Sequence, residues 1–410
     1  MNTVQVSAFR DHLAERLRDW RAHGLERVPA SFSTAQSPEA VVDGDPRLLF
    51  SSSNYLGLAT RPEVLGAARR ALDRYGAGSG GSRLTTGTTS LHRELEEELA
   101  DWLGYPRCVL TATGYQANVA ALTVLGDSRS GPVTIFSDAD NHASIIDGIR
   151  LARASGARLS VYPHRDATAL ARQVADRTTD HAVVVSDGVF SMDGSVAPVA
   201  RLREICDRTG ALLVIDDAHG IGAVGADGRG CTAGEGRPDL LVGTSSKALG
   251  VEGGFLCCDE VVGDLLVNQA RSYVFSTSSP APVVAATLAA VRLVRDGRAG
   301  VDDLHRNIVR LRRRLTEAGL VVAGPSTAVP TPVVPVAVGD EVVATTVADG
   351  LRREGFHVPA IRYPTVPRGA AILRVTVMAG HTSAQIDALV GALERQVKDL
   401  VPGGVSGSVR

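Results

Sequence analysis

The sequence has 410 residues, of which 44% are hydrophobic and 21% are charged, and its formal net charge is −2 at pH 7. This length suffices for a large core and for two or three domains, while the balanced charge argues against a nucleic-acid or membrane partner. The apolar runs are too short for a membrane span, and the first residues lack a signal-peptide pattern. Five irregularly spaced cysteines indicate free buried thiols rather than disulfides or a metal site, so we expect a cytoplasmic protein without a metal.

The N-terminal part is predicted to contain helices separated by polar and glycine-rich segments. Residues 7–24 form an amphipathic helical pattern, a short strand is expected at 48–50, and further helices are expected at 62–75 and 91–103. The stretch between 76 and 87 contains too many glycines for regular structure, and such a backbone can approach a ligand closely.

From residue 107 onward, strand and helix patterns alternate, which predicts an α/β fold with a mostly parallel sheet covered by helices. Many strands are continuous apolar runs, as expected when both faces of a sheet are buried. A final sheet strand is expected at 253–258, with an antiparallel orientation as one option. The other strands are expected at 107–111, 133–137, 158–162, 182–186, 211–215 and 239–243, and the helices at 115–125, 143–154, 166–178 and 197–209.

The pattern changes after residue 280, where a smaller α+β unit is predicted. Its helices are expected at 281–296, 301–318, 342–354 and 383–399, and its strands at 333–338 and 371–377, with a proline-punctuated connector at 325–335. We therefore divide the chain into an N-terminal helix and connector (1–45), a large domain (46–285), a small C-terminal domain (286–400) and a tail predicted to be disordered (401–410).

Polar clusters follow most strands of the predicted sheet. In parallel α/β sheets, ligands bind outside the carboxyl ends of the strands, so we expect these clusters to form one site. The clusters are Thr113-Gly114-Tyr115, Asn141-His142, Asp187 to Gly194, Asp216 to His219, and Thr244 to Lys247.

Lys247 ends an apolar strand and enters a tight, glycine-rich turn, where a lysine is not needed for solubility. We interpret Lys247 as the residue that carries pyridoxal 5′-phosphate (PLP) as a Schiff base. For a single lysine, an ordinary surface loop is the commoner explanation, and only the neighbouring clusters favour the cofactor.

Asp216 ends another buried strand, and His219 follows three residues later. A buried carboxylate needs a partner, and a protonated pyridine nitrogen is a good one because the pairing keeps the ring an electron sink. His219 is close enough in sequence to bond the phenolic oxygen of the same cofactor. The alternative is an aspartate that caps a turn beside a structural histidine.

Two more residues fit the same ring. His142 follows the second strand and is expected to stack on the pyridine, although an isolated histidine is more often structural. Ser191 lies in the segment 187–194 and is expected to donate to the phenolic oxygen, whereas a turn explains only Asp193-Gly194.

Anion-binding positions complete the predicted site. The helix that opens at Thr113 presents N–H groups that suit a phosphate, and Thr244, Ser246 and the run 276–279 offer hydroxyl groups, although helix capping is a competing role. Arg374 lies inside an apolar strand, where a substrate carboxylate is a natural bidentate partner and an internal salt bridge is the alternative.

Together, these residues resemble the α-oxoamine synthases, PLP enzymes of fold type I, the aspartate aminotransferase-like fold. The resemblance runs from about residue 20 to 395. The segments 79–84 and 360–362 are most similar to those of the family members that act in biotin synthesis. Its motifs are Asn54-Tyr55-Leu56-Gly57, Gly78 to Arg83, Asn141 to Ser144, Gly188 to Gly194, Asp216 to Gly220, Thr244 to Lys247, and Tyr363 to Pro367 with Arg374.

The resemblance implies a role for each residue. Lys247 forms the internal aldimine and moves the proton, with Asp216, His219 and His142 as catalytic partners around the ring. Ser191 contacts the phenolic oxygen, and a dimer partner supplies two further residues. The phosphate is assigned to Gly114, Tyr115 and Thr244, the contacts across a homodimer interface to Ser276 and Thr277, and the substrate to Asn54, Arg374 and Ser82.

The resemblance also implies the reaction, a decarboxylative condensation of a small amino acid with an acyl thioester to give an α-amino ketone. L-Alanine with a pimeloyl group on CoA or a carrier protein is favoured; glycine or another acyl donor, including one of specialised metabolism, remains open. Arg21 or Arg27 is a candidate for an acyl carboxylate, with a solvated surface arginine as the alternative. An aminotransferase, or a regulatory protein that has lost catalysis, is a further alternative.

Overall fold

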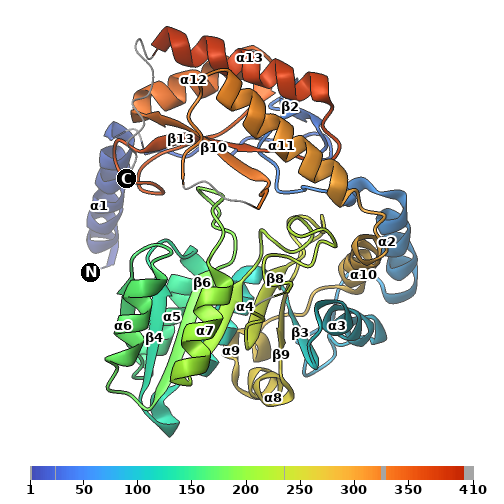
Figure 1. The fold of residues 1–410 in the computed structure, drawn as a ribbon, viewed down its shortest axis with the longest axis vertical. Coiled ribbons are helices and arrows are strands. Elements are labelled where there is room, and N and C mark those ends of the chain that lie inside the picture. The colour runs from blue at the N-terminus through green and yellow to red at the C-terminus, as the bar shows by residue number, and fades with distance from the viewer. Residues whose placement is uncertain (1, 24, 235, 325–328, 401–410) are drawn as a thin grey trace.

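The computed structural model describes residues 2–23, 25–234, 236–324 and 329–400. A large sheet with its helices occupies one half of the molecule, and a smaller layered unit sits against the carboxyl ends of its strands (Figure 1). The helix α1 (Asn2–Ala22) stands at one side of the smaller unit, with its N-terminal end toward the half that holds the large sheet. None of the helices in the described part of the chain combines the length and the apolar character that a membrane span needs.

The large sheet has seven strands in the order β3-β9-β8-β7-β6-β4-β5. Six of them run in the same direction, as predicted for a mostly parallel sheet, and β9 runs opposite to them because it pairs antiparallel with both β3 and β8. Every residue of β4 and β8 is buried because helices cover both faces, whereas the edge strand β5 is largely exposed. The strands are β3 (Arg107–Thr111), β4 (Val133–Asp138), β5 (Arg158–Tyr162), β6 (His181–Asp187), β7 (Leu212–Asp216), β8 (Leu240–Thr244) and β9 (Gly254–Cys258).

Helices connect the strands and bury their apolar faces against the sheet. Two of them show why they begin where they do: the Thr113 hydroxyl accepts from the backbone of Gln116 at the start of α4, and the Asp259 carboxylate accepts from the backbone of Val262 at the start of α8. The helices are α4 (Gly114–Leu125), α5 (Ala143–Ala154), α6 (Ala167–Ala175), α7 (Val199–Thr209), α8 (Glu260–Gln269) and α9 (Arg271–Val274).

The smaller unit contains an antiparallel sheet, in the order β10-β13-β12, with helices packed on one side (Figure 1). Leucines and an isoleucine of α11 recur every three or four residues and are fully buried, which explains why this highly charged helix packs on one face. The elements are α11 (Val301–Glu317), β10 (Val333–Gly339), α12 (Glu341–Arg353), β12 (Ala360–Ile361), β13 (Ala371–Thr376) and α13 (Ser383–Leu400).

The N-terminal part joins the two units. β1 (Glu39–Val42) and β2 (Asp45–Leu49) form a hairpin to which β11 (Phe356–His357) adds in parallel. The helices α2 (Pro62–Tyr75), α3 (Ser90–Leu103) and α10 (Ala281–Arg295) pack together beside β3. Four large apolar side chains of α1 are exposed in this single chain, Phe9, Leu13, Leu17 and Trp20, with Phe9 at 63% and Trp20 at 42%.

Most predicted elements are confirmed within a few residues, with some differences. The strand expected at 48–50 is β2, which ends at Leu49, and the helix expected at 197–209 begins only after Pro198. The sequence analysis missed the strands β1, β11 and β12, the helices α8 and α9, and two single-turn 3₁₀ helices at Leu58–Thr60 and Ser128–Ser130. The five cysteines are free, and four of them are buried. The predicted tail at 401–410 and part of the predicted connector lie outside the described residues, and the domain boundaries remain a prediction.

Candidate active site

A cavity of about 230 Å³ opens at the carboxyl ends of the parallel strands. It collects residues from five separate segments of the chain, as the strand-end argument predicted. Nearly all of the residues assigned to a cofactor line this one cavity: Gly114, Tyr115, His142, Ser191, Asp216, His219, Thr244 and Lys247.

Lys247 follows β8 and enters a turn closed by a bond from Gly250 N to Lys247 O, 2.9 Å long. Gly250 has a φ of 71°, and a Cβ atom there would lie 2.4 Å from Ala59 N, so the turn requires glycine. Burial lowers the pKa of Lys247, while the carboxylates of Asp216 and Asp187 oppose this effect. Lys247 and Lys398 are the only lysines in a sequence with 43 basic residues, so lysine is not the residue that this chain uses for surface charge.

Asp216 is buried at the end of β7 and is held by two neutral donors. Its Oδ2 accepts from Asn118 Nδ2 at 2.5 Å, and its Oδ1 accepts from Ala218 N at 3.0 Å. The Asn118 amide also donates to Ser144 Oγ, at 2.9 Å. Asn118 was not among the predicted site residues, although it lies four residues after Gly114 and therefore on the same face of α4.

His219 is buried, and its Nδ1 lies 2.7 Å from the hydroxyl of Tyr55. Burial and the charges of Lys247 and Arg374 lower the pKa of His219 well below its usual value, so the ring is neutral. A Tyr55 hydroxyl that donates to Nδ1 leaves the proton on Nε2. Tyr55 was also missed, although its motif was recognised, because only Asn54 was given a role.

His142 lies at the start of α5 with an exposed ring. Its Nδ1 is 2.7 Å from Ser144 Oγ and accepts from Ser144 N at 3.3 Å, so the side chain caps the helix. Desolvation lowers the pKa of His142, although Asp216 opposes this. The capping bond holds the side chain in place, and His142 lines the cavity.

The start of α4 and Thr244 also line the cavity. The helix has its first backbone bond from Ala117 N to Thr113 O, so the N–H groups of Gly114 and Tyr115 precede the helical ladder. A Cβ atom at Gly114 would lie 3.1 Å from Thr244 Cβ, which leaves little room for a side chain. The Tyr115 hydroxyl bonds Asp147, so this residue offers its backbone rather than its hydroxyl.

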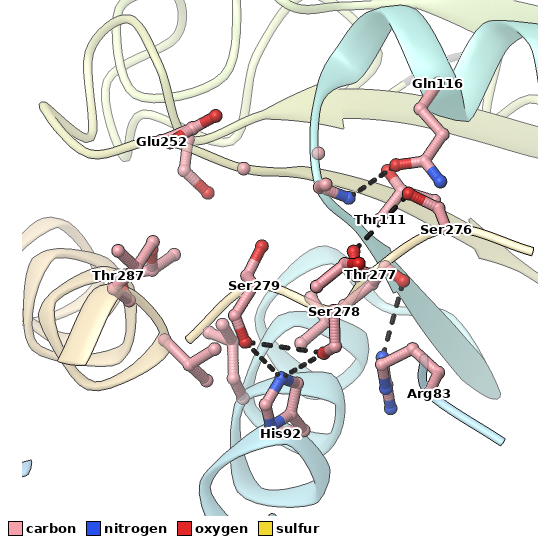
Figure 2. A pocket seen from close by; sticks show the side chains of 18 of the residues that line it. Arg83, His92, Thr111, Gln116, Glu252, Ser276, Thr277, Ser278, Ser279 and Thr287 are labelled. Carbon is pink, nitrogen blue, oxygen red and sulfur yellow. Dashed lines mark hydrogen bonds between the residues drawn. The ribbon is translucent and has the colours of Figure 1, made fainter. Parts of the chain in front are cut away.

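Three predicted residues lie elsewhere in the single chain. Ser276 and Thr277 line a separate narrow cavity with Arg83 and His92 (Figure 2). Ser82 forms an isolated bridge with Thr277, so the glycine-rich segment belongs to this second region. The structure therefore does not bring Ser82, Ser276 and Thr277 to Lys247 within one chain.

The other two predicted substrate residues, Arg374 and Asn54, lie near the cavity without lining it. Arg374 is half-buried in β13, and its Nε donates to Ser191 O at 2.6 Å. The segment that contains Asn54 runs beside the end of β13, where Thr376 Oγ1 donates to Ser52 O at 2.8 Å. The side chain of Asn54 already makes a hydrogen bond, in which its Nδ2 donates to Gln36 O at 2.9 Å.

The sheet order, the covering helices and the strand-end cavity define the fold of PLP-dependent, aminotransferase-like enzymes, as predicted. Residues 46–393 match the family described as aminotransferase class I and II, and the chain belongs to this family.

Two curated relatives are similar to the chain over nearly its whole length. The biotin biosynthesis bifunctional protein BioWF of Cutibacterium acnes is 50% identical over 97% of this chain, but the chain spans only 60% of that relative. The 8-amino-7-oxononanoate synthase of Pseudomonas paraeruginosa is 41% identical over 95% of both chains. These relatives confirm the predicted resemblance to the α-oxoamine synthases.

A solved structure gives the same picture. A variant of serine palmitoyltransferase from S. paucimobilis, with a PLP–myriocin aldimine bound, superposes with a TM-score of 0.87 and 29% identity. The match covers 96% of this chain and 98% of the solved one. PLP, the cofactor predicted from the sequence, is thus the cofactor of this fold family.

Proposed function

We propose that this protein is a PLP-dependent acyltransferase that condenses L-alanine with a pimeloyl thioester, with loss of carbon dioxide and release of the thiol. The observation that carries the proposal is the convergence of Lys247, Asp216, His219 and His142 on one cavity. It is supported by the full-length similarity to 8-amino-7-oxononanoate synthases.

The cavity fits PLP in the chemistry of its walls. Asp216 is a buried carboxylate that accepts from two neutral donors, the Asn118 amide and the Ala218 backbone, which suits a cationic ring nitrogen. The free N–H groups at the start of α4 and the crowded position at Gly114 suit a phosphate group that approaches the backbone closely. Within the described ranges, no carboxylate lies within 4.0 Å of the Lys247 amine, which leaves the amine available for a covalent link.

When bound, PLP supplies an electron sink for a carbanion at the α-carbon of the amino acid. Asp216 would hold the proton on the ring nitrogen, and Nε2 of His219 and the Ser191 hydroxyl would donate to the phenolic oxygen. His142 would stack on the ring, held by its bond to Ser144. Gly114 and Tyr115 would bind the phosphate through their N–H groups, together with Thr244.

We assign to Lys247 the removal of the proton from the α-carbon of the amino acid. Its lowered pKa raises the fraction of neutral amine near neutral pH, and only the neutral amine accepts a proton. Arg374 would bind the substrate carboxylate through the guanidinium nitrogens that do not contact Ser191 O. The substrate carboxylate would then lie between the two units of the molecule.

The favoured substrates follow from the product named for the relatives. In 8-amino-7-oxononanoate, the terminal methyl and the carbon that bears the amine correspond to alanine without its carboxylate. The remaining seven carbons correspond to a pimeloyl group. The full-length relatives with this name are 40–42% identical to the chain, which supports alanine as the amino acid.

We further propose a homodimer, with Ser276 and Thr277 reaching the phosphate of the partner's site. Apolar side chains of α1 and Phe275, which is 72% exposed, lie on the surface of the single chain. Such exposed apolar groups support a surface that a second copy of the chain covers in the dimer. The free cysteines agree with a reducing compartment such as the cytoplasm.

The test is a substrate screen of the purified, PLP-loaded protein. L-Alanine, glycine and L-serine are each combined with pimeloyl-CoA, a pimeloyl-carrier protein, succinyl-CoA and palmitoyl-CoA, and free thiol and product mass are followed together. We expect thiol release that requires both alanine and a pimeloyl donor. Formation of a keto acid without any thioester would instead indicate an aminotransferase and would overturn the proposal.

A further inference from the structure

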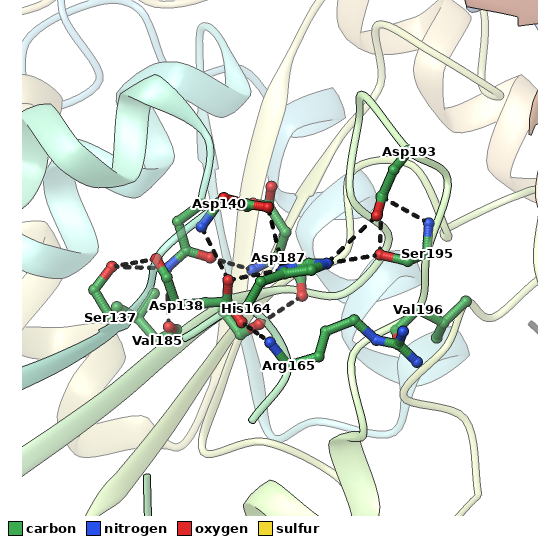
Figure 3. A network of polar contacts seen from close by, with 12 residues as sticks. Ser137, Asp138, Asp140, His164, Arg165, Val185, Asp187, Asp193, Ser195 and Val196 are labelled. Atoms are coloured by element: carbon green, nitrogen blue, oxygen red, sulfur yellow. Dashed lines mark hydrogen bonds and ion pairs between the residues drawn. The ribbon is translucent and has the colours of Figure 1, made fainter. Parts of the chain in front are cut away.

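His164 lies immediately behind the candidate site, just after β5, and is not a lining residue of the cavity. Carboxylates approach its ring from two sides (Figure 3). Nδ1 is 3.0 Å from Asp138 Oδ1, and Nε2 is 3.4 Å from Asp193 Oδ2 and 3.2 Å from Ser195 Oγ. The ring also packs edge-on against Phe190, with 4.3 Å between the centroids. Because both ring nitrogens face acceptors, the arrangement is suited to a histidine that donates twice.

The Asp138 side is rigid. Asp138 ends β4 and is 1% exposed. Its Oδ2 accepts from Arg165 N at 2.7 Å, and its Oδ1 also accepts from Asp140 N at 3.0 Å. His164 is therefore anchored to the central sheet through a fully bonded carboxylate.

The Asp193 side belongs to the loop 188–196, which we call the bridging loop. Asp193 Oδ1 accepts from Ser195 N at 2.9 Å and from Ser195 Oγ at 2.8 Å, and Phe190 N donates to Ser195 O at 2.9 Å. The loop reaches from the large sheet toward the β10-β13 sheet in Figure 1. His164 is attached to this loop at its tip.

The bridging loop contacts the smaller unit through its backbone. Ser191 O accepts from Arg374 Nε at 2.6 Å, and Gly194 O accepts from Thr331 Oγ1 at 2.8 Å. A Cβ atom at Gly194 would lie 2.2 Å from Val333 O, so the loop packs tightly there. The orientation of the Arg374 guanidinium thus depends on a carbonyl two residues from Asp193.

The charges around His164 favour its cationic form. Burial by itself would lower the pKa of His164, but its bonds to Asp138 and Asp193 outweigh burial and raise the pKa to about 9. Asp140 Oδ2 lies 3.6 Å from Nδ1 and adds to the same effect, while Arg165 directs its guanidinium Nε to Val196 O at 2.8 Å. Burial would raise the pKa of Asp193, and the bonds from His164 and Ser195 instead lower it.

We propose that protonated His164 is a positioning residue for the amino-acid substrate: it holds the bridging loop between Asp138 and Asp193, so that Ser191 O orients Arg374 toward the substrate carboxylate. The inference rests on the proposed function, in which Arg374 binds that carboxylate. It predicts a defect in amino-acid binding rather than in the chemical step.

The experiment compares His164→Gln with the wild-type holoenzyme. Alanine affinity is measured from the alanine-dependent change in cofactor absorbance, and KM and kcat are measured at saturating acyl donor, all from about pH 7 to pH 10. Near pH 7, we expect about a tenfold rise in Kd and KM for alanine and less than a twofold change in kcat. As the pH rises past about 9, wild-type His164 loses its proton, so the ratio of variant KM to wild-type KM should fall toward one. Effects of pH on alanine itself cancel in this ratio.

A second variant and a control keep the test decisive. Asp193→Asn retains the shape of the loop but removes one of the charges that hold the proton, so the rise in KM should begin at a lower pH than in the wild type. His181→Gln changes an exposed histidine at the start of β6, the opposite end of the sheet, and should change nothing. Hydrogen exchange at the Phe190, Gly194 and Ser195 amides should accelerate in His164→Gln and Asp193→Asn but not in His181→Gln.

Two outcomes are distinguishable. A KM ratio that stays constant across the pH range, or a loss confined to kcat, would overturn the role of His164. A wild-type holoenzyme that shows no response to alanine, glycine or serine would instead refute the proposed function itself. If His164→Gln does not fold, the pH shift of Asp193→Asn carries the test alone.

Discussion

The hydroxyl of Tyr55 lies 2.7 Å from Nδ1 of His219, although 164 residues separate the two in sequence. Tyr55 is fully buried, and the neighbouring Arg374 partly offsets the effect of burial, which raises the pKa of the tyrosine. The contact orients a histidine that lines the cavity, and a Tyr55 hydroxyl that donates in it leaves the ring proton on Nε2. Because Arg374 neighbours Tyr55, the contact also links His219 to the predicted substrate-binding arginine.

Tyr55→Phe is expected to lower kcat about tenfold, because a buried Nδ1 without its partner costs about 1–3 kcal/mol. Turnover and cofactor absorbance of the holoenzyme would be compared with those of the wild type. The control is Tyr75→Phe, which removes a hydroxyl that bonds only the nearby Ser90. Equal activity of the two variants would show that the Tyr55 bond does not serve catalysis.

Asn118→Asp is expected to weaken PLP binding more than Asn118→Ala does. The first substitution places a second carboxylate where the Asn118 amide now donates to Asp216 at 2.5 Å, and like charges at this distance repel. Cofactor dissociation constants would be measured by absorbance titration. Asn268→Asp serves as a surface control, and a ranking in which Ala is the more damaging substitution would contradict the role given to Asn118.

Lys247→Ala is expected to abolish turnover and the covalent attachment of PLP. Borohydride treatment of the wild-type holoenzyme should fix the cofactor to the peptide that contains Lys247. The sequence offers a clean control, since Lys398 is the only other lysine and lies on the surface in an ion pair with Glu394. Cofactor found on the Lys398 peptide, or turnover retained in Lys247→Ala, would refute the proposed mechanism.

His381 is expected to make the fold sensitive to acid. Its ring stacks on Phe50 at 4.1 Å, Nδ1 accepts from Met378 N, and burial lowers the pKa of His381 to about 4. The neutral ring is preferred in the folded state, so this stabilisation is complete above about pH 6.5 and is lost as the pH falls toward 4.

The free energy of unfolding of the wild-type holoenzyme should therefore decrease between pH 7 and pH 4 by about 3 kcal/mol more than that of His381→Gln. Denaturant titrations at several pH values measure this difference. His12→Gln, on the exposed helix α1, should keep the wild-type pH dependence. Parallel curves for wild type and His381→Gln would contradict the prediction.

Local sequence determined much of the fold. Apolar runs such as 182–185 and 212–215 are strands because they are buried on both faces, and the long amphipathic helices follow from their three- and four-residue spacing. The elements that were missed have weak local signals: β11 and β12 contain two residues each. Such strands form only because a neighbouring strand, brought close by the rest of the fold, offers its backbone bonds.

The sequence by itself also determined the chemistry of the site. Lys247, Asp216, His219 and His142 each lie at or shortly after the end of a strand, and the common direction of parallel strands is enough to bring them to one edge. Tertiary structure alone decided which residues support them. Asn118 bonds Asp216, Tyr55 bonds His219, and His164 bonds the bridging loop through contacts between distant segments, which no local pattern records. Spacing along the chain encodes the elements, whereas the supporting hydrogen bonds depend on how those elements meet in space.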